Sequence, residues 1–160
     1  MGLVTVRKNG EVIDQGQNLI LEGGIISFCA AFVDYQASGS SFVVDRLILG
    51  DSDEPVSFFQ RHIQGNPYGG NQTPGVDWTS ITVTEDTSQQ GQLTLDFAYA
   101  GYIPSGNPII REFTLHTPFS AAILALGGEG FAVARFVTSE FELESGADID
   151  VTWVLNFTED

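Results

Sequence analysis

The chain has 160 residues, of which 42% are hydrophobic and 17% are charged, so it has the length of one domain and enough apolar side chains to bury a core. Six Lys and Arg residues against 21 Asp and Glu residues give a formal net charge of −15. This charge repels nucleic acid and anionic lipid, because binding to phosphate groups depends on Lys and Arg. We therefore expect a single domain over residues 1–160 that has neither nucleic acid nor a membrane as its partner.

The N-terminal residues predict a β-hairpin. The pair Asn9-Gly10 separates the apolar runs Leu3–Arg7 and Val12–Asp14, and this pair favours the positive φ values of a tight hairpin turn. We expect residues 1–16 to form a hairpin that acts as an arm and adds a strand to a neighbouring protein. The start of the chain has no basic residues followed by an apolar run, so we expect a protein made in the cytoplasm without a secretory signal.

The segment Asn18–Tyr35 predicts one short helix. Its apolar positions include helical spacings, and its length and its alanines disfavour a strand, although Gly23-Gly24 weakens the pattern. Asn18 is expected to cap the first turn, with Glu22 facing the positive end of the helix dipole. Cys29 is the one cysteine of the chain, and we expect it to be a small buried apolar side chain.

Beyond residue 41, residues 42–49 are apolar apart from Asp45-Arg46, and in most of the segments after residue 75 apolar side chains recur at every second position, which is typical of strands. The last segment shows this best, because Trp153 and its apolar neighbours at every second position alternate with polar residues. Strands, one helix and glycine-rich turns together predict a mainly β protein, an antiparallel, jelly-roll-like β-sandwich. The expected strands are 42–49, 81–84, 93–99, 109–116, 131–137 and 149–157, with 121–126 as either a strand or a turn of helix.

Residues 50–75 have little periodicity and many turn-forming residues, which predicts a long contact loop. Loops of this length in a compact domain are usually functional or ordered by what they contact. Phe58, Phe59 and Tyr68 are candidate anchors on a neighbouring subunit, and Arg61 is a candidate charge partner. Alternatively, Phe58 and Phe59 cover an open end of the sandwich, and the sequence favours neither interpretation.

The sequence offers little material for catalysis or metal binding. The two histidines, His62 and His116, lie outside any nucleophile motif. Pro55 interrupts the acidic residues 51–54 before a calcium-binding loop is complete, and the alternating glutamates of 140–144 predict a solvated strand edge. We therefore expect no catalytic residue, no cofactor and no metal ion, and a protein that is not an enzyme.

Five short segments follow one another between residues 17 and 157. They are an Asn-apolar-apolar-x-x-Gly segment, an apolar strand ending in Gly, an Arg-Glu-apolar strand, an Ala-Arg-apolar strand and a final Val-x-Trp-x-apolar-x-Phe strand. Their positions are Gln17–Gly24, Arg46–Asp51, Ile110–Leu115, Phe131–Phe136 and Asp150–Phe157. This succession resembles the small structural proteins of tailed-bacteriophage virions, a group that includes head decoration, tail and baseplate components. The resemblance implies a β-sandwich that binds its neighbours as an oligomer and performs no chemistry.

Within that group, we expect a capsid decoration or cement protein. Such a protein binds the outer face of the major capsid protein shell as a dimer or trimer, stabilises it, and reaches the virion by assembly in the host cytoplasm. An acidic exterior suits the outer face, which is far from the genome. The alternatives are a tail, baseplate or fibre component and, in another class, a carbohydrate-binding module with Trp78, Tyr99 and Tyr102 as its sugar platform.

Overall fold

The protein is mainly β, as its sequence predicts. Nine antiparallel strands form one sheet in the described part of the chain, in the order β4-β3-β7-β8-β2-β1-β9-β6-β5. The computed structural model describes residues 2–22, 24–25, 46–60, 64, 67–68, 80–85, 92–102, 107–116 and 132–156. The strands are β1 (Gly2–Lys8), β2 (Glu11–Ile20), β3 (Arg46–Gly50), β4 (Pro67–Tyr68), β5 (Ser80–Glu85), β6 (Gln92–Tyr102), β7 (Ile109–His116), β8 (Ala132–Glu142) and β9 (Ala147–Asn156).

The strand predictions from period-two patterns are confirmed for β5, β6, β7, β8 and β9, although β8 extends five residues beyond the expected end at residue 137. The predicted strand 42–49 is confirmed from Arg46 onward, and residues 42–45 lie outside the described residues. The segment 121–126 and Cys29 also lie outside them.

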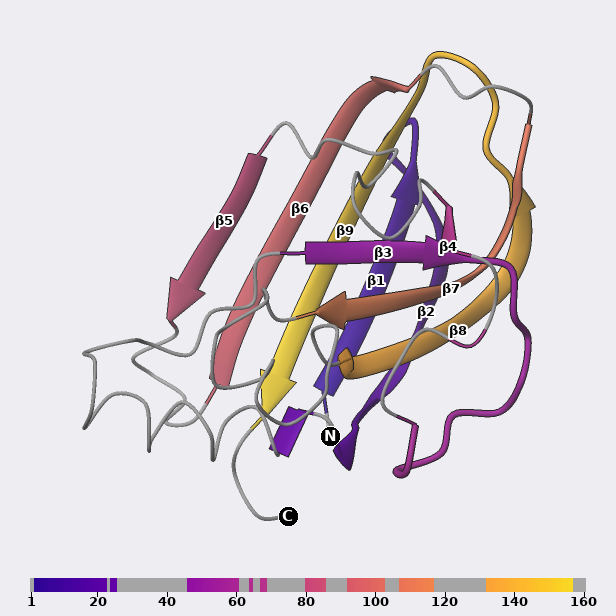
Figure 1. Cartoon of the computed structure of the whole chain (residues 1–160). Helices are drawn as coiled ribbons and strands as arrows, with labels where there is room; N and C mark the ends of the chain where they lie inside the picture. The colour runs from indigo at the N-terminus through magenta and orange to yellow at the C-terminus, as the bar shows by residue number, and fades with distance from the viewer. Residues whose placement is uncertain are drawn as a thin grey trace, which may run out of the picture.

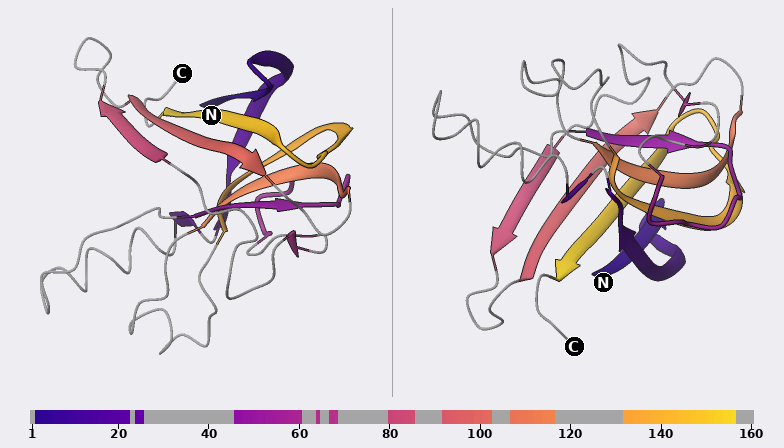
Figure 2. Two further views of the ribbon diagram at one scale, coloured as in Figure 1. Left: turned by 90° about the horizontal axis from the view of Figure 1, so that it is seen from above. Right: turned by 60° about the horizontal axis from the view of Figure 1, so that its bottom comes forward.

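The sheet curls so that its two halves face each other across one core. Figure 1 shows β3 and β7 running at a steep angle to β6, β9 and β1, and Figure 2 shows β6 and β9 on one side of β3 and β7 when viewed from above. β2 joins the halves, because it pairs with β1 along its length but with β8 only at Leu19 and Ile20. The core between the halves takes buried side chains from both, among them Val4, Phe97, Phe113, Phe136 and Trp153.

The N-terminal hairpin is present, but it is not a free arm. Asn9 and Gly10 have φ values of 52° and 82°, as the Asn-Gly turn predicts. β1 then lies inside the sheet, paired with β2 on one side and with β9 on the other. Val4 and Val6 are completely buried. β1 therefore adds no strand to a neighbour, because its own chain already pairs both of its edges. β2 pairs with β8 only at Leu19 and Ile20, so strand addition through residues 11–16 stays a prediction.

The predicted helix start at Asn18 is also wrong, because β2 continues to Ile20. The Asn18 side chain is buried, where its Oδ1 accepts a hydrogen bond from the Gly2 N–H at 3.1 Å and its Nδ2 donates one to the Val154 carbonyl at 3.2 Å. The helical turn begins at Glu22. Residues 26–35 of the predicted helix lie outside the described residues. The Asn18 amide thus joins β2 to β1 and β9 by hydrogen bonds instead of capping a helix.

Asp14 bridges the point where β2 and β8 separate. Its Oδ2 accepts hydrogen bonds from the Ser139 N–H at 2.6 Å and from the Thr138 hydroxyl at 2.8 Å, and its Oδ1 accepts one from the Gln15 N–H at 2.7 Å. Partial burial raises the pKa of this carboxyl, but the hydrogen bonds outweigh it and hold the pKa below the ordinary value of 3.8. The carboxylate therefore stabilises the folded state while it is ionised.

This carboxylate makes the stability of the fold sensitive to acid. Because the pKa of Asp14 is lower in the folded chain, its contribution is complete above pH 3.8 and is lost as the pH falls through the folded pKa. We expect Asp14→Asn to lower the free energy of unfolding by about 1 kcal/mol at neutral pH. The difference from the unsubstituted chain should shrink below pH 3.8 in urea unfolding curves. Glu11→Gln removes an exposed carboxylate from the same strand and is the control. A difference between Asp14→Asn and the unsubstituted chain that stays constant as the pH falls would contradict this role.

Candidate functional site

The candidate site is the loop that follows β3. Leu47 and Leu49 bury this strand in the core, and the chain leaves the sheet after Gly50. It returns at β4, where Pro67 and Tyr68 pair with Gly50 and Leu49. The predicted contact loop 50–75 is therefore closed on β3 by a short antiparallel pairing.

A buried ion pair lies beneath this loop. Glu112 on β7 and Arg135 on β8 belong to neighbouring strands, and both side chains are completely buried. The Arg135 Nε donates to the Glu112 Oε2 at 2.6 Å. Removing two charges from water is costly, so such a pair persists only where further hydrogen bonds satisfy the remaining polar atoms.

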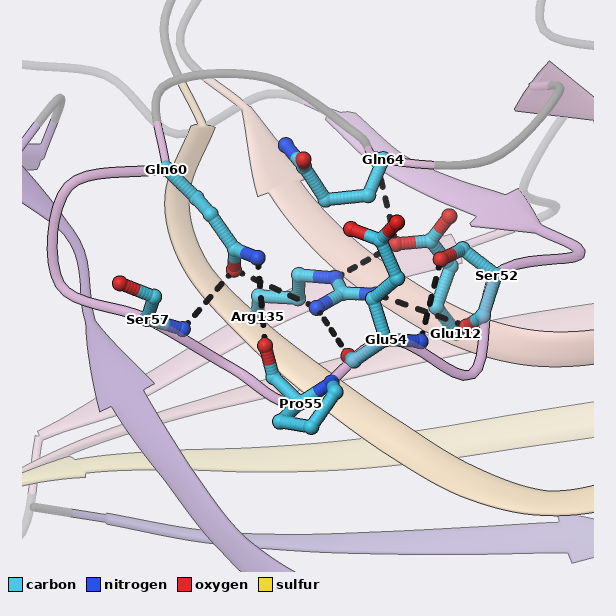
Figure 3. Close-up of polar contacts among 8 residues, drawn as sticks. All are labelled: Ser52, Glu54, Pro55, Ser57, Gln60, Gln64, Glu112 and Arg135. Carbon is cyan, nitrogen blue, oxygen red and sulfur yellow. Dashed lines mark hydrogen bonds and ion pairs between the residues drawn. The ribbon is translucent and has the colours of Figure 1, made fainter.

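The loop supplies those further partners (Figure 3). The Arg135 Nη1 donates to the Glu54 carbonyl at 2.7 Å and to the Gln60 Oε1 at 3.3 Å, and its Nη2 donates to the Ser52 carbonyl at 3.4 Å. From the far side, the Gln64 N–H donates to the Glu112 Oε2 at 3.4 Å. The loop thus wraps around one buried guanidinium. Each of the three guanidinium nitrogens of Arg135 donates a hydrogen bond to another part of the protein.

Gln60 braces the tip of the loop. Its N–H donates to the Ser57 carbonyl at 3.1 Å, which closes a four-residue turn. Its side-chain oxygen accepts from the Ser57 N–H at 3.0 Å, and its Nε2 donates to the Pro55 carbonyl at 3.2 Å. This geometry puts Phe58 and Phe59 at the two central positions of the turn.

These two phenylalanines, the aromatic pair, project into solvent. Phe58 is 40% exposed and Phe59 is 75% exposed. Their ring centroids lie 5.4 Å apart in an edge-to-face arrangement. The Phe58 carbonyl accepts a hydrogen bond from the Glu22 N–H at 2.7 Å, and the exposed Ile25 lies in that same helical turn. Both rings are therefore accessible to another molecule, and their contact with a partner stays a prediction.

The other two candidate contact residues are less completely described. Arg61 lies outside the described residues, and for Tyr68 the structure describes the backbone, which pairs with Leu49. Sequence reasoning missed Arg135, Glu112 and Gln60 as the parts that hold the aromatic pair in place. The available signal was Arg135 as the one charge inside the apolar segment Phe131–Phe136, together with Glu112 between Arg111 and Phe113 in a second predicted strand.

Glu140 on β8 and Glu144 just after this strand pair with basic side chains of the same chain. The Arg111 guanidinium donates to the Glu140 carboxylate at 2.9 Å and to the Asp51 carbonyl at 3.3 Å, and Lys8 pairs with Glu144. Among the residues that the structure describes, no group of three or more His, Cys, Asp or Glu side chains could hold a metal ion. Glu140 and Glu144 thus pair with different cations. His116 is buried, while Trp78 and His62 lie outside the described residues, as do the side chains of Tyr99 and Tyr102.

No protein-family model, curated protein or solved structure matches this chain. In the described ranges, no helix is long and apolar enough to cross a membrane. The candidate site is therefore defined by its geometry: an exposed aromatic pair on a turn that is braced by Gln60 and by a buried ion pair.

Proposed function

We propose that this protein is a non-enzymatic structural component of a tailed-bacteriophage virion, a capsid decoration or cement protein. It binds the outer face of the major capsid protein shell, stabilises it, and acts as a homo-oligomer. The observation that carries the docking function is the exposed aromatic pair on its braced turn. The order of the five sequence segments supports the assignment to a virion.

The aromatic pair has the properties of an interface anchor. Aromatic residues dominate the binding energy of protein interfaces when a partner encloses them in a pocket. A side chain as exposed as Phe59 gains from such enclosure, because its apolar surface leaves water. Arg135 and Gln60 already order the turn, so binding loses less conformational entropy than it would with a flexible loop.

The charges around the pair support a position on the outside of a shell. Asp53 and Glu54 are exposed beside the turn. In the described part of the chain, Arg7, Lys8, Arg111 and Arg135 each donate to a group of the same chain. The surface is therefore dominated by carboxylates, which repel the packaged genome and keep neighbouring particles apart.

We also propose that the two facing halves of the curled sheet act as the two layers of a jelly-roll-like sandwich. The shared core supports this proposal, because it takes buried side chains from both halves. A sandwich of this kind leaves the loops at its ends available for contacts, and the loop 51–60 is one of them.

The test is co-sedimentation with undecorated heads of the phage that encodes the chain. We expect the unsubstituted protein to pellet at a defined ratio per capsid subunit or per symmetry axis. The double variant Phe58→Ala/Phe59→Ala should bind about thirtyfold or more weakly, as expected for loss of an interface anchor. Val12→Ala removes an equally exposed apolar side chain from the hairpin and should bind like the unsubstituted protein.

Two results would overturn this proposal. If the unsubstituted protein does not pellet with heads, it is not a cement protein. Isolated tails and baseplates then become the assemblies to test with the same variants. If the double variant pellets as well as the unsubstituted protein, the aromatic pair is not the docking surface.

A further inference from the structure

The two edges of the sheet differ in a way that points to a second contact surface. β4 ends the sheet with two residues, and Pro67 has no N–H to offer another strand. β5 ends the other side with six residues. It pairs with β6 on one side, and among the described strands none pairs with its other side (Figure 1).

β5 carries none of the features that normally protect an edge strand. Its sequence, Ser-Ile-Thr-Val-Thr-Glu, contains no proline and no lysine, and its one charge is at its last position. Its register with β6 runs from Ser80 to Glu85 without a bulge. Natural proteins blunt long edge strands with such features, so an edge that lacks them is suited to pairing with another strand.

The register with β6 assigns the positions of β5 to the two faces of the sheet. Ile81 and Val83 lie opposite Phe97 and Leu95, which are buried in the core. Thr82 lies opposite Asp96, which is half-buried on the outer face. Directly opposed residues of antiparallel strands share a face, so the odd positions belong to the core face and the even positions to the outer face.

We propose that β5 pairs antiparallel with β5 of a second copy of this chain, about a twofold axis that passes through Thr82. A residue placed opposite itself keeps the core faces of both copies on the same side of the joined sheet. In this register Ile81 lies opposite Val83 of the partner subunit, and Ser80 lies opposite Thr84 of the partner subunit. Apolar positions thus meet apolar positions and hydroxyl positions meet hydroxyl positions, which are favourable cross-strand pairs.

The match of the segment 80–84 to itself about Thr82 favours a second copy as the occupant, and charge limits the surface and the register through which that copy binds. Each copy has a net charge of −15, so two copies can approach only through a segment that is nearly free of charge, and residues 80–84 are such a segment. The twofold axis through Thr82 pairs residues 80–84 of the two copies and leaves Glu85 outside the paired segment. An axis through Val83 would instead set the charged Glu85 opposite Ile81 of the partner subunit. This contact between a charge and an apolar residue disfavours that register.

The first test is the mass of the purified protein in solution at several concentrations. We expect a species of twice 17.3 kDa that dissociates on dilution. Thr82→Glu sets two carboxylates directly opposite each other at the axis, in copies that are already acidic, and should weaken the dimer at least tenfold, with an unchanged circular dichroism spectrum. Thr94→Glu adds the same charge to the same face one strand further in, opposite Thr84, and should leave the dimer intact.

The second test is a cross-link. Opposed Cα atoms in an antiparallel pair lie about 4.5–5.5 Å apart, which a disulfide spans. Thr82→Cys should therefore form a covalent dimer on mild oxidation, whereas Thr94→Cys and the unsubstituted chain, with its native Cys29, should not.

The proposal is overturned if the protein is a monomer at every concentration, or if a dimer persists in Thr82→Glu and Thr82→Cys does not cross-link. Neither measurement uses capsids. A failure of the twofold contact therefore leaves docking through Phe58 and Phe59 standing, and a failure to pellet with heads leaves the twofold contact standing.

Discussion

Replacing Arg135 with methionine is expected to lower the free energy of unfolding by about 3–5 kcal/mol. The variant leaves the Glu112 carboxylate buried without its guanidinium partner. It also removes the donors that satisfy the carbonyls of Ser52 and Glu54 beneath the loop. Urea unfolding at neutral pH, followed by far-ultraviolet circular dichroism, measures the loss.

Arg111→Met is the matched control. Arg111 also binds a glutamate and a loop carbonyl, but its pair with Glu140 is exposed to solvent, so its removal should cost about 0–1 kcal/mol. The double variant Arg135→Met/Glu112→Leu should recover part of the stability, because it leaves no unpaired buried charge. Equal losses for Arg135→Met and Arg111→Met would contradict the role assigned to the buried pair.

Arg135→Met also tests whether the buried ion pair supports the docking surface. Arg135 does not touch solvent, so it cannot contact a capsid directly. If it positions the aromatic pair, Arg135→Met should pellet more weakly with heads at a temperature where it is still folded. Faster proteolysis within the loop 51–60 should accompany that weakening. Unchanged binding by folded Arg135→Met would show that the turn is held in place without it.

Trp153→Ala is expected to cost about 3–5 kcal/mol of stability. Trp153 is completely buried at the centre of the sheet, where its register partners are Val4 on β1 and Leu95 on β6. Its removal leaves a cavity between the two halves of the curled sheet. Urea unfolding followed by circular dichroism measures the loss without relying on tryptophan fluorescence.

Two variants show whether burial causes that loss. Trp153→Phe keeps a ring in the core and should cost less than half as much as Trp153→Ala. It should lose no hydrogen bond, since the indole Nε1 has no partner among the described residues. Val154→Ala changes the next residue, which lies on the opposite face and is half-buried, and should cost about 1 kcal/mol or less. If Val154→Ala costs as much as Trp153→Ala, the core does not depend on the tryptophan.

The sequence alone was sufficient for the features that depend on a few neighbouring residues. The hairpin turn at Asn9-Gly10 follows from the backbone conformations that those two residues tolerate. Strand β9 and its buried face follow from alternation, because side chains of successive strand residues point to opposite faces. The long loop with its two phenylalanines follows from the lack of periodicity in residues 50–75. The sequence left open whether these phenylalanines contact a partner or cover the fold.

Tertiary structure decided the features that depend on residues far apart in the chain. Asn18 is suited to a helix cap when only its neighbours are considered, but it bonds Gly2 and Val154 instead. The hairpin was expected to be an arm, but β9, which lies more than 130 residues later in the chain, pairs with the edge of β1.

The amino-acid sequence by itself determined that this protein is a mainly β, strongly acidic chain with an N-terminal hairpin and an aromatic loop, because strand period, turn conformation and net charge are properties of local sequence. Only the tertiary structure decided that the sheet curls around one core and that Arg135 holds the aromatic loop in place. The physical reason is that a buried charge needs partners, and those partners come from segments as much as 83 residues away.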